Sequence, residues 1–381
     1  MLRYASAALL FALACAPAPD ATPNEPPNDT PNNTTGDAGA DAPPFVTEPH
    51  ALPPPIPSNG GGVLASANVV VVTFANYEFA DDVEAMADWI PTSQWLAATG
   101  AEYGVGTPSV LAKVRLAESA PSFGSASDFT AWVASKVGSE LPPASPSTLY
   151  MIVFPAGESF SDPSIGSMCG SFTGYHDASA RAYTFAAIGT CPGHVAGLTD
   201  VEQVERVFSH ELVEALTDPF GDGFAARDAS DPWSYVSGGE VADVCNGYAR
   251  EGGFLAVRSW SNAAAAAGLD PCQPSAGTYF GVAASSQSTN VVAAGSQVTI
   301  DLVGFSDAPT NDWAVELKQG RVDFDPAITF SPGAMNNGRA ASITIGVPAS
   351  ASSGAIATLL LRSFHGGDAS YTLQPIVVRA Q

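Results

Sequence analysis

Two uninterrupted apolar runs constrain the fold of this 381-residue chain more than any other feature. Asn68–Phe74 is rich in β-branched valine, and Thr148–Phe154 is almost wholly apolar. Such runs are typical of strands that are buried in a sheet. Segments with the acidic first turns or capping residues of helices lie among them, at residues 81–89, 127–137 and 200–216. Strands that alternate with helices predict a mixed α and β domain over residues 63–275.

The pattern changes after Pro274. Short β-rich segments are separated by Gly, Pro, Asn and Ser, and the sequence shows no helical periodicity there. About 100 residues of this kind predict an immunoglobulin-like β-sandwich over residues 276–381. The expected fold class is therefore α+β, a mixed α/β domain followed by an all-β domain.

The first residues have the pattern of an export signal. Arg3 precedes an apolar run, Tyr4–Ala14, that is shorter than the roughly 20 residues needed to span a bilayer. The run ends at Ala12-Leu13-Ala14-Cys15, which resembles a bacterial lipobox with Ala12 where Leu is usual. We expect residues 1–15 to be a lipoprotein signal peptide with Cys15 as the lipidated residue. The alternative is ordinary signal cleavage that releases a soluble protein.

Residues 16–62 are rich in Pro, Asn, Asp, Thr and Gly. Because this composition buries little apolar surface, it predicts a disordered tether. A lipid anchor followed by a tether predicts an exported protein, an outer-membrane or cell-surface lipoprotein on the periplasmic or extracellular face. The membrane would be one partner. Nucleic acid is not expected as another, since a net charge of -24 repels phosphate backbones.

The cysteines fit an exported protein. If Cys15 carries lipid, four of the five cysteines remain, an even number suited to an oxidising compartment. Four cysteines allow three pairings, and sequence proximity favours Cys169–Cys191 and Cys245–Cys272. A zinc site made of these cysteines is less favoured, because no C-x-x-C spacing occurs.

The stretch with the clearest chemistry is Ser209–Pro219, SHELVEALTDP. Residues four apart lie on one helical face, so His210 and Glu214 are predicted to bind one metal ion. Glu211 lies about 100° further round the helix, within reach of a metal-bound water. This is the logic of H-E-x-x-H zinc hydrolases, in which the intervening Glu is the general base. Here Glu214 stands where that motif has its second His.

A third ligand is expected from Glu240-Val241-Ala242-Asp243. On a short helix, this spacing puts Glu240 and Asp243 on one side. We expect Glu240 as the ligand, and Asp243 as an outer residue that orients His210. Two carboxylates and one His predict zinc, with calcium or manganese as alternatives, since this ligand set is more anionic than two His and one Glu. The alternative to a metal site is an ordinary acidic amphipathic helix that contains one His and binds no metal.

Tyr175 and His176 are further candidates for catalytic residues, with a weaker sequence signal. They lie between Cys169 and Cys191, in the stretch Ser171–His176. Either side chain is predicted to donate a hydrogen bond to a developing oxyanion, as hydrolases require. A surface turn beside a disulfide is the alternative interpretation.

These motifs resemble the phosphate-induced, exordium-like proteins of plants, and more closely their bacterial and fungal relatives. The resemblance rests on H-E-x-x-E-x-x-T-D-P at His210–Pro219 and on E-V-A-D-x-C at Glu240–Cys245. Three further similar segments are Glu102–Gly106, Gly174–His176 and Trp260–Ala264. It covers residues 65–275 and departs at Thr173, where Gly is expected. It implies a zincin-like fold and supports the pairing of Cys245 with Cys272, but it implies no settled activity.

The expected function is metal-assisted hydrolysis by a zinc peptidase-like enzyme. In this interpretation His210, Glu214 and Glu240 bind zinc, Glu211 activates water, and the substrate is a peptide or cell-surface material. The rival is a non-catalytic surface or adhesion protein in which the cluster holds a structural ion or none. The two differ in whether the metal keeps an open coordination position.

Overall fold

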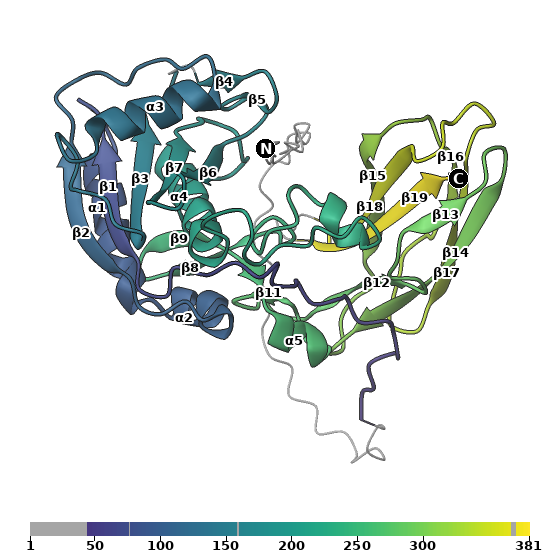
Figure 1. Cartoon of the computed structure of the whole chain (residues 1–381). Helices are drawn as coiled ribbons and strands as arrows, with labels where there is room; N and C mark the ends of the chain where they lie inside the picture. Colours follow the sequence, from purple (N-terminus) through teal and green to yellow (C-terminus); the bar gives the residue numbers. More distant parts are fainter. Residues whose placement is uncertain (1–43, 76, 158–159, 367–370) are drawn as a thin grey trace, which may run out of the picture.

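The computed structural model describes residues 44–75, 77–157, 160–366 and 371–381 (Figure 1). The predicted signal peptide, with Cys15, and residues 16–43 of the predicted tether lie outside the described residues. Among the described residues, no helix combines the length and the apolar character needed to cross a membrane.

A five-stranded sheet organises the first part of the described chain, in the order β2-β1-β3-β7-β6. Its strands are β1 (Asn68–Thr73), β2 (Ser109–Arg115), β3 (Thr148–Phe154), β6 (Gly174–Ala178) and β7 (Thr184–Gly189). The first four strands in that order are parallel, and β6 pairs antiparallel with β7. The antiparallel strand β6 therefore lies at one edge of the sheet.

Helices cover both faces of this sheet (Figure 1). They are α1 (Ala80–Trp89), α2 (Gln94–Gly100), α3 (Ala126–Lys136) and α4 (Asp200–Thr217), with short 3-10 turns η1 (Ile90–Thr92) and η2 (Ala101–Tyr103). Val69 and Val71 of β1 share a core with α1, α2 and α4, whereas Val70 and Val72 share a core with α3. Alternate side chains of one strand thus enter opposite cores, which explains why the two apolar runs are uninterrupted.

Helix α4 begins with a capping box. The Thr199 hydroxyl accepts the Glu202 N–H, and the Glu202 carboxylate accepts the Thr199 N–H at 2.8 Å. Further along, α4 holds the hairpin of β8 (Tyr248–Glu251) and β9 (Phe254–Val257). The Leu255 N–H donates to the Glu205 carboxylate at 2.9 Å, and the Val257 N–H donates to the Ser209 hydroxyl at 3.0 Å. Two α4 side chains thereby fix β9 along the helix.

Both predicted disulfides are present, Cys169–Cys191 and Cys245–Cys272. The first disulfide links two segments: Cys169 follows the short paired strands β4 (Ser161–Asp162) and β5 (Gly166–Ser167), and Cys191 follows β7. The second ties the segment after η3 (Pro232–Tyr235) to β11 (Cys272–Gln273), which pairs with β10 (Ser259–Trp260) near α5 (Asn262–Ala266). Two disulfides are typical of an oxidising, extracytoplasmic compartment.

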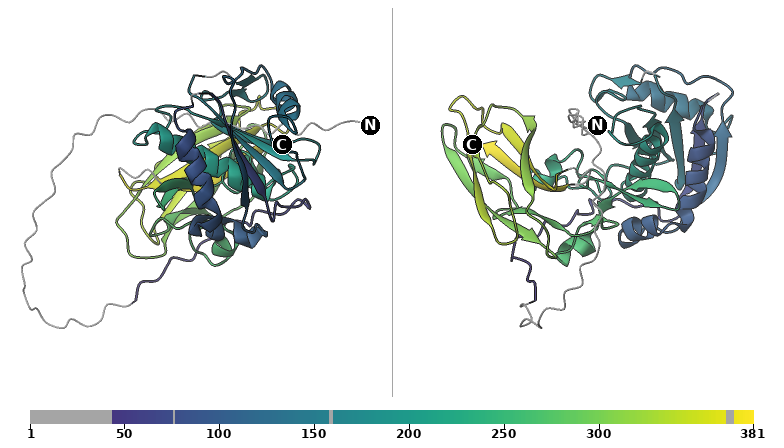
Figure 2. Two further views of the ribbon diagram at one scale, coloured as in Figure 1. Left: turned by 90° about the vertical axis from the view of Figure 1, so that its left-hand side faces the viewer. Right: turned by 180° about the vertical axis from the view of Figure 1, so that it is seen from behind.

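The last part of the chain is all β and consists of two four-stranded sheets (Figure 2). One has the order β12-β14-β17-β16, the other β13-β19-β18-β15. Their strands are β12 (Phe280–Ala284), β13 (Asn290–Val292), β14 (Gln297–Ser306), β15 (Ala314–Val322), β16 (Ala327–Phe330), β17 (Ala340–Gly346), β18 (Ile356–Phe364) and β19 (Thr372–Ala380). Ile300 and Ile343 of the first sheet share a core with Leu359 and Ile376 of the second. The chain is therefore α+β, and independent folding of residues 63–275 and 276–381 stays a prediction.

The tether prediction is wrong for residues 44–62, which lie along the folded body (Figure 1). The His50 ring stacks on Phe305 of β14, with ring centroids 3.8 Å apart. The backbone of Ile56, whose side chain is buried, exchanges hydrogen bonds of 2.7 and 2.9 Å with the Asn262 side chain. Composition missed this segment because a few apolar side chains and backbone groups are enough to dock an extended strap.

The buried carboxyl group of Glu205 should make the stability of the protein depend on pH. Burial raises its pKa from 4.5 to about 7, although the Leu255 N–H lowers it. Because the folded state binds this proton more tightly than the unfolded state, the free energy of unfolding should fall by about 1–3 kcal/mol as pH rises from 5 to 8. Glu205→Gln should remove that loss, as measured by urea unfolding at each pH. The exposed Glu140→Gln serves as the control. Equal pH slopes for wild type and Glu205→Gln would contradict this account.

Candidate metal centre

One face of α4 carries the central cluster of ionisable side chains. His210 and Glu214 are one turn apart, and the His210 Nε2 lies 3.2 Å from the Glu214 Oε1. Glu211 and Glu214 are only 4% and 3% exposed, because this face packs toward β6 and the loop after the helix. The helical spacing predicted from the sequence therefore brings His210, Glu211 and Glu214 together.

Asp243 completes a three-residue group with His210 and Glu214. Its Oδ1 lies 3.5 Å from the His210 Nε2, and its N–H donates to the Glu214 Oε1 at 3.1 Å. One donor atom from each of the three side chains lies within 4.8 Å of the others. The Gly238 N–H donates to the Asp243 Oδ2 at 2.8 Å, and a Cβ added to Gly238 would lie 2.6 Å from that oxygen, so a larger residue here would have to displace the Asp243 carboxylate.

Glu240 occupies a different place from the one predicted. Its Oε1 lies 3.3 Å from Arg227, and its Oε2 lies 3.8 Å from the His176 Nε2. The expected short helix is a turn, and Glu240 pairs with Ala225 as an isolated bridge. The turn separates the two carboxylates, so their places relative to His210 differ from those expected, and which of them binds a metal stays a prediction. Asp243 joins the group around His210, and Glu240 lies outside it.

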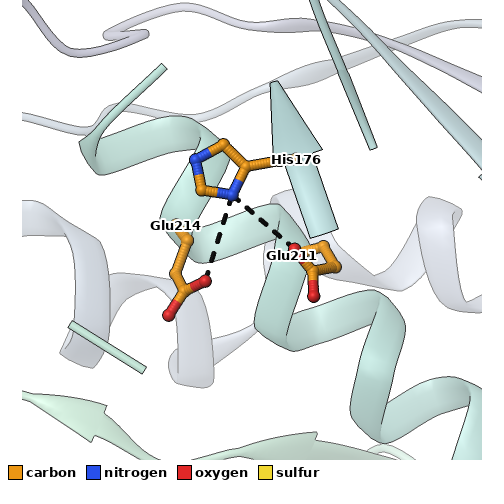
Figure 3. Close-up of side chains that lie close together, drawn as sticks. All are labelled: His176, Glu211 and Glu214. Atoms are coloured by element: carbon orange, nitrogen blue, oxygen red, sulfur yellow. Dashed lines mark ion pairs between the residues drawn. The ribbon is translucent and has the colours of Figure 1, made fainter. Parts of the chain in front are cut away.

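His176 lies on β6 opposite the helix, beside both glutamates of the motif (Figure 3). Its Nδ1 is 3.6 Å from the Glu211 Oε2 and 4.0 Å from the Glu214 Oε2. Its Nε2 lies 3.2 Å from the Asp218 carbonyl oxygen. His176, Glu211 and Glu214 form a second group whose donor atoms lie within 4.8 Å, so the two groups share Glu214.

The Tyr175 ring lies mainly in the core on the α3 side of the sheet. Successive strand residues point to opposite faces, so Tyr175 faces away from α4 when His176 faces toward it. The Tyr175 ring packs in the core of the α3 face, against Phe160 and Phe172. Tyr175 also lines the acidic cleft together with His176 and Glu211, so its role as a hydrogen-bond donor to an oxyanion stays a prediction.

Gly174 sets the close approach between β6 and α4. A Cβ on this residue would lie 2.6 Å from the Glu211 Oε1 and 2.7 Å from the Val207 Cγ1. Both distances are shorter than real Cβ contacts allow. The strand can therefore lie against Glu211 only because this position is glycine, which gives a physical meaning to the Gly-Tyr-His stretch.

The cluster is strongly anionic. Glu211, Glu214, Glu240 and Asp243 lie close together, and Arg227 is shared between Glu240 and Asp218. Burial opposes a charge on His176, but Glu240, Glu211 and Glu214 raise its pKa to about 10. Burial, and then the charge of Asp243, raise the pKa of Glu214 to about 7. Protonation of these groups therefore reduces the negative charge of the cluster. A bound divalent cation would reduce that negative charge in the same way.

Sequence reasoning assigned no role to Asp218 and Arg227. Asp218 is fully buried; its Oδ1 accepts the Gly223 N–H at 2.6 Å, and its Oδ2 accepts from Arg227 at 2.5 Å. Arg227 then reaches Glu240. Asp218 was visible as part of Thr217-Asp218-Pro219, but nothing in the sequence pointed to its partner.

Two clefts open beside the cluster, and both include Glu211 and Asp243. The basic cleft, of about 300 Å³, has these other charged or histidine residues: His194, Arg206, His210, Arg258 and Arg362. The acidic cleft, of about 450 Å³, has these: His176, Asp177, Glu214, Arg227 and Glu240. The cluster is therefore reachable from two sides, one lined by more arginines and the other by more carboxylates.

Comparisons with known proteins identify no family. No protein-family model matches the chain, and no curated protein matches it. One similar solved structure is a nucleoside hydrolase-related hypothetical protein from Saccharophagus degradans, described as associated with carbohydrate metabolism. It is 12% identical, the match covers 83% of this chain and 100% of that chain, and the TM-score is 0.29. A score this low supports no inference about fold or function.

Gly174→Ala tests the close approach of β6 to α4. The added Cβ must displace Glu211 or the strand, so we expect a loss of about 1–3 kcal/mol in the free energy of unfolding. Gly62→Ala is the control, because its Cβ meets nothing within 4 Å. Chemical denaturation measures both. An unchanged stability for Gly174→Ala would show that the strand and helix do not approach as described.

Proposed function

We propose that this protein is a metal-dependent hydrolase that acts on peptide bonds. The observation that carries the proposal is the convergence of His210, Glu214 and Asp243, with Glu211 next to them on the same helix. Three protein ligands leave one position of a tetrahedral site open, as in catalytic rather than structural zinc sites. One imidazole nitrogen and two carboxylates suit zinc, and manganese or calcium are the alternatives.

The buried charge supports a cation at this position. Burial of several carboxylates without enough positive charge is unfavourable, and Arg227 is already shared with Asp218. A divalent ion held by the three ligands would polarise a substrate carbonyl and make a water more acidic.

Glu211 is the proposed general base. It lies beside both ligand groups, is almost fully buried, and is reached from both clefts. Its carboxylate would take the proton from the attacking water and return it to the leaving amine. We propose His176 as a positioning residue, because its Nδ1 faces Glu211 at 3.6 Å while its Nε2 lies near the Asp218 carbonyl. The earlier role of His176 as an oxyanion donor is less suited to these contacts.

A peptide substrate is favoured by the edge strand β6. Within the described part of the chain, β6 pairs with β7 alone, and it carries Gly174 and His176 beside the cluster. Extended peptides bind by adding a strand to such an edge, through backbone hydrogen bonds that do not depend on the side chains. A peptide added to β6 would pass next to Glu211.

We also propose the finer features expected from the sequence. The family resemblance supports a zincin-like domain related to exordium-like proteins, and the Cys245–Cys272 disulfide agrees with it. The two-sheet arrangement of the C-terminal part is compatible with an immunoglobulin-like sandwich. The rival function is a surface protein with a structural ion, and the burial of Glu214 favours it over a surface protein without metal.

Metal binding and the role of Glu211 are tested together on the full chain. We expect the wild type to bind zinc stoichiometrically by elemental analysis after dialysis, and His210→Ala or Asp243→Ala to lose it. Glu211→Gln should keep the metal but lower hydrolysis of a responsive peptide by about 10²–10⁴-fold, the usual effect of a positioned base. Glu240→Gln is the informative comparison, because it should keep stoichiometric metal.

The contrary outcomes separate the alternatives. A wild type that binds no metal overturns both the hydrolase and the structural ion. Metal binding with no turnover of any peptide favours the structural ion. Turnover that Glu211→Gln leaves unchanged removes Glu211 as the base.

Membrane anchoring is a separate proposal. The two disulfides support an exported protein, and the sequence around Cys15 supports a lipid anchor. Cys15→Ser should move the protein from the membrane fraction to the soluble fraction after expression in a bacterium that processes lipoproteins. A variant that stays with the membranes would contradict the anchor.

A further inference from the structure

The two oxygens of the Glu214 carboxylate face different histidines. Its Oε1 lies 3.2 Å from the His210 Nε2 on the same helix, and its Oε2 lies 4.0 Å from the His176 Nδ1 on β6. The first oxygen is thus directed to the group that contains His210 and Asp243, and the second to the group that contains His176 and Glu211. A carboxylate placed in this way can bridge two metal ions, which lie about 3.5–4 Å apart in two-metal sites.

The spacing within the second group suits a shared ion better than hydrogen bonds. The His176 Nδ1 lies 3.6 Å from the Glu211 Oε2 and 4.0 Å from the Glu214 Oε2 (Figure 3). Both separations exceed the roughly 2.7–3.2 Å of a hydrogen bond. Two ligand atoms that each lie about 2.0–2.2 Å from one zinc ion can be up to about 4.4 Å apart. The nitrogen and each of the two oxygens are therefore near enough to share an ion.

An unsatisfied hydroxyl in the same cleft points to a polar ligand there. Tyr175, the neighbour of His176 on β6, is 7% exposed, and its hydroxyl has no hydrogen-bond partner among the described residues. The acidic cleft is lined by Tyr175 together with His176, Glu211 and Glu214. A buried hydroxyl without a partner is rare in a folded protein and is explained by water or an ion nearby. A water bound to an ion in this cleft is a suitable partner.

The acidic cleft has more negative charge than one divalent ion offsets. Five carboxylates line it, and Arg227 is the one guanidinium among the described residues that line it. The carboxylates are those of Asp177, Glu211, Glu214, Glu240 and Asp243. One divalent ion and one guanidinium carry three positive charges against these five groups. A second cation or protons must offset the remainder.

We propose that His176, Glu211 and Glu214 form a second site for a divalent cation, bridged to the first site through Glu214. The second ion should bind more weakly than the first, because two cations held by one carboxylate repel each other. It would also engage Glu211, and a carboxylate beside a cation is a poor acceptor of a proton. Occupation of the second site should therefore inhibit hydrolysis. The inhibition rests on the proposed function, whereas the binding of a second ion does not.

Zinc binding to the full chain tests the site directly. Calorimetric titration of the chelator-treated protein with zinc chloride should show two ions per chain, the second bound at least about tenfold more weakly. His176→Gln and Glu211→Gln should each lose the second ion and keep the first. Glu214→Gln should weaken both, because its carboxylate contributes one oxygen to each site. Circular dichroism checks that each variant folds.

Two control variants separate ligation from general attraction of cations. Asp177→Asn removes a negative charge from the same strand and the same cleft, but the exposed Asp177 belongs to neither group. His194→Gln removes a histidine that lines the basic cleft and also belongs to neither group. Both variants should still bind two ions, with the affinity for the second ion within about threefold of the wild type.

The second ion should also change the rate of hydrolysis. With a responsive peptide, the wild type should be most active at one zinc per chain. Its rate should fall about 10²-fold or more as the second ion binds, since that ion occupies the proposed base. The rate of His176→Gln, whatever its level, should show no such fall with excess zinc. A wild-type rate that stays unchanged or rises as the second ion binds overturns the inhibition.

The outcomes separate this proposal from the proposed function. One ion per chain, or a second ion that neither His176→Gln nor Glu211→Gln removes, overturns the second site and leaves the proposed hydrolase in place. An equal loss of affinity in Asp177→Asn and His176→Gln also overturns it. Two ions with the expected pattern but no hydrolysis of any peptide support the second site, and the peptidase function then fails. If no zinc binds at all, both proposals fail.

Discussion

The burial of carboxylates between α4 and β6 is the constraint on which the rest of the site depends. A carboxylate held away from water needs hydrogen-bond donors or positive charge close by. The fold supplies donors from the backbone of Gly238 and Asp243, and a guanidinium from Arg227. Glycine at position 174 brings the strand with His176 into contact with the helix. A divalent cation would complete the balance of charge.

Helix α4 connects this site to the whole fold. One side packs on the central sheet, another carries the ligands, and Glu205 and Ser209 hold β9. The turn that carries Asp243 ends at Cys245, whose disulfide to Cys272 fixes it against β11. The all-β part contributes Arg362 and Tyr371 to the basic cleft, and the strap at residues 44–62 contacts both parts. The candidate active site therefore draws on elements far apart in the sequence.

The sequence predicted those parts of the molecule that depend on local patterns. The apolar runs gave β1 and β3, the Thr199 cap located the start of α4, and proximity gave the two disulfides. The edge strand β6 and the hairpin of β8 and β9 were not predicted, because their stability comes from α4 and the sheet rather than from their own residues. The three-residue spacing of Glu240 and Asp243 predicted that both carboxylates would lie on one side of a short helix, near His210. Their separation depends on a turn and on Arg227, which no local pattern shows.

The same limit applied to function. The H-E-x-x-E spacing predicted a shared helical face, which is a local property, but the two clefts beside the cluster depend on side chains from β6, α4 and β18. The most direct test of the central claim is a crystal grown with zinc and measured at the zinc absorption edge. The account predicts an anomalous peak about 2.0–2.2 Å from the His210 Nε2 and from oxygens of Glu214 and Asp243. A crystal with ordered side chains and no peak there, or a peak bound by other residues, would contradict it.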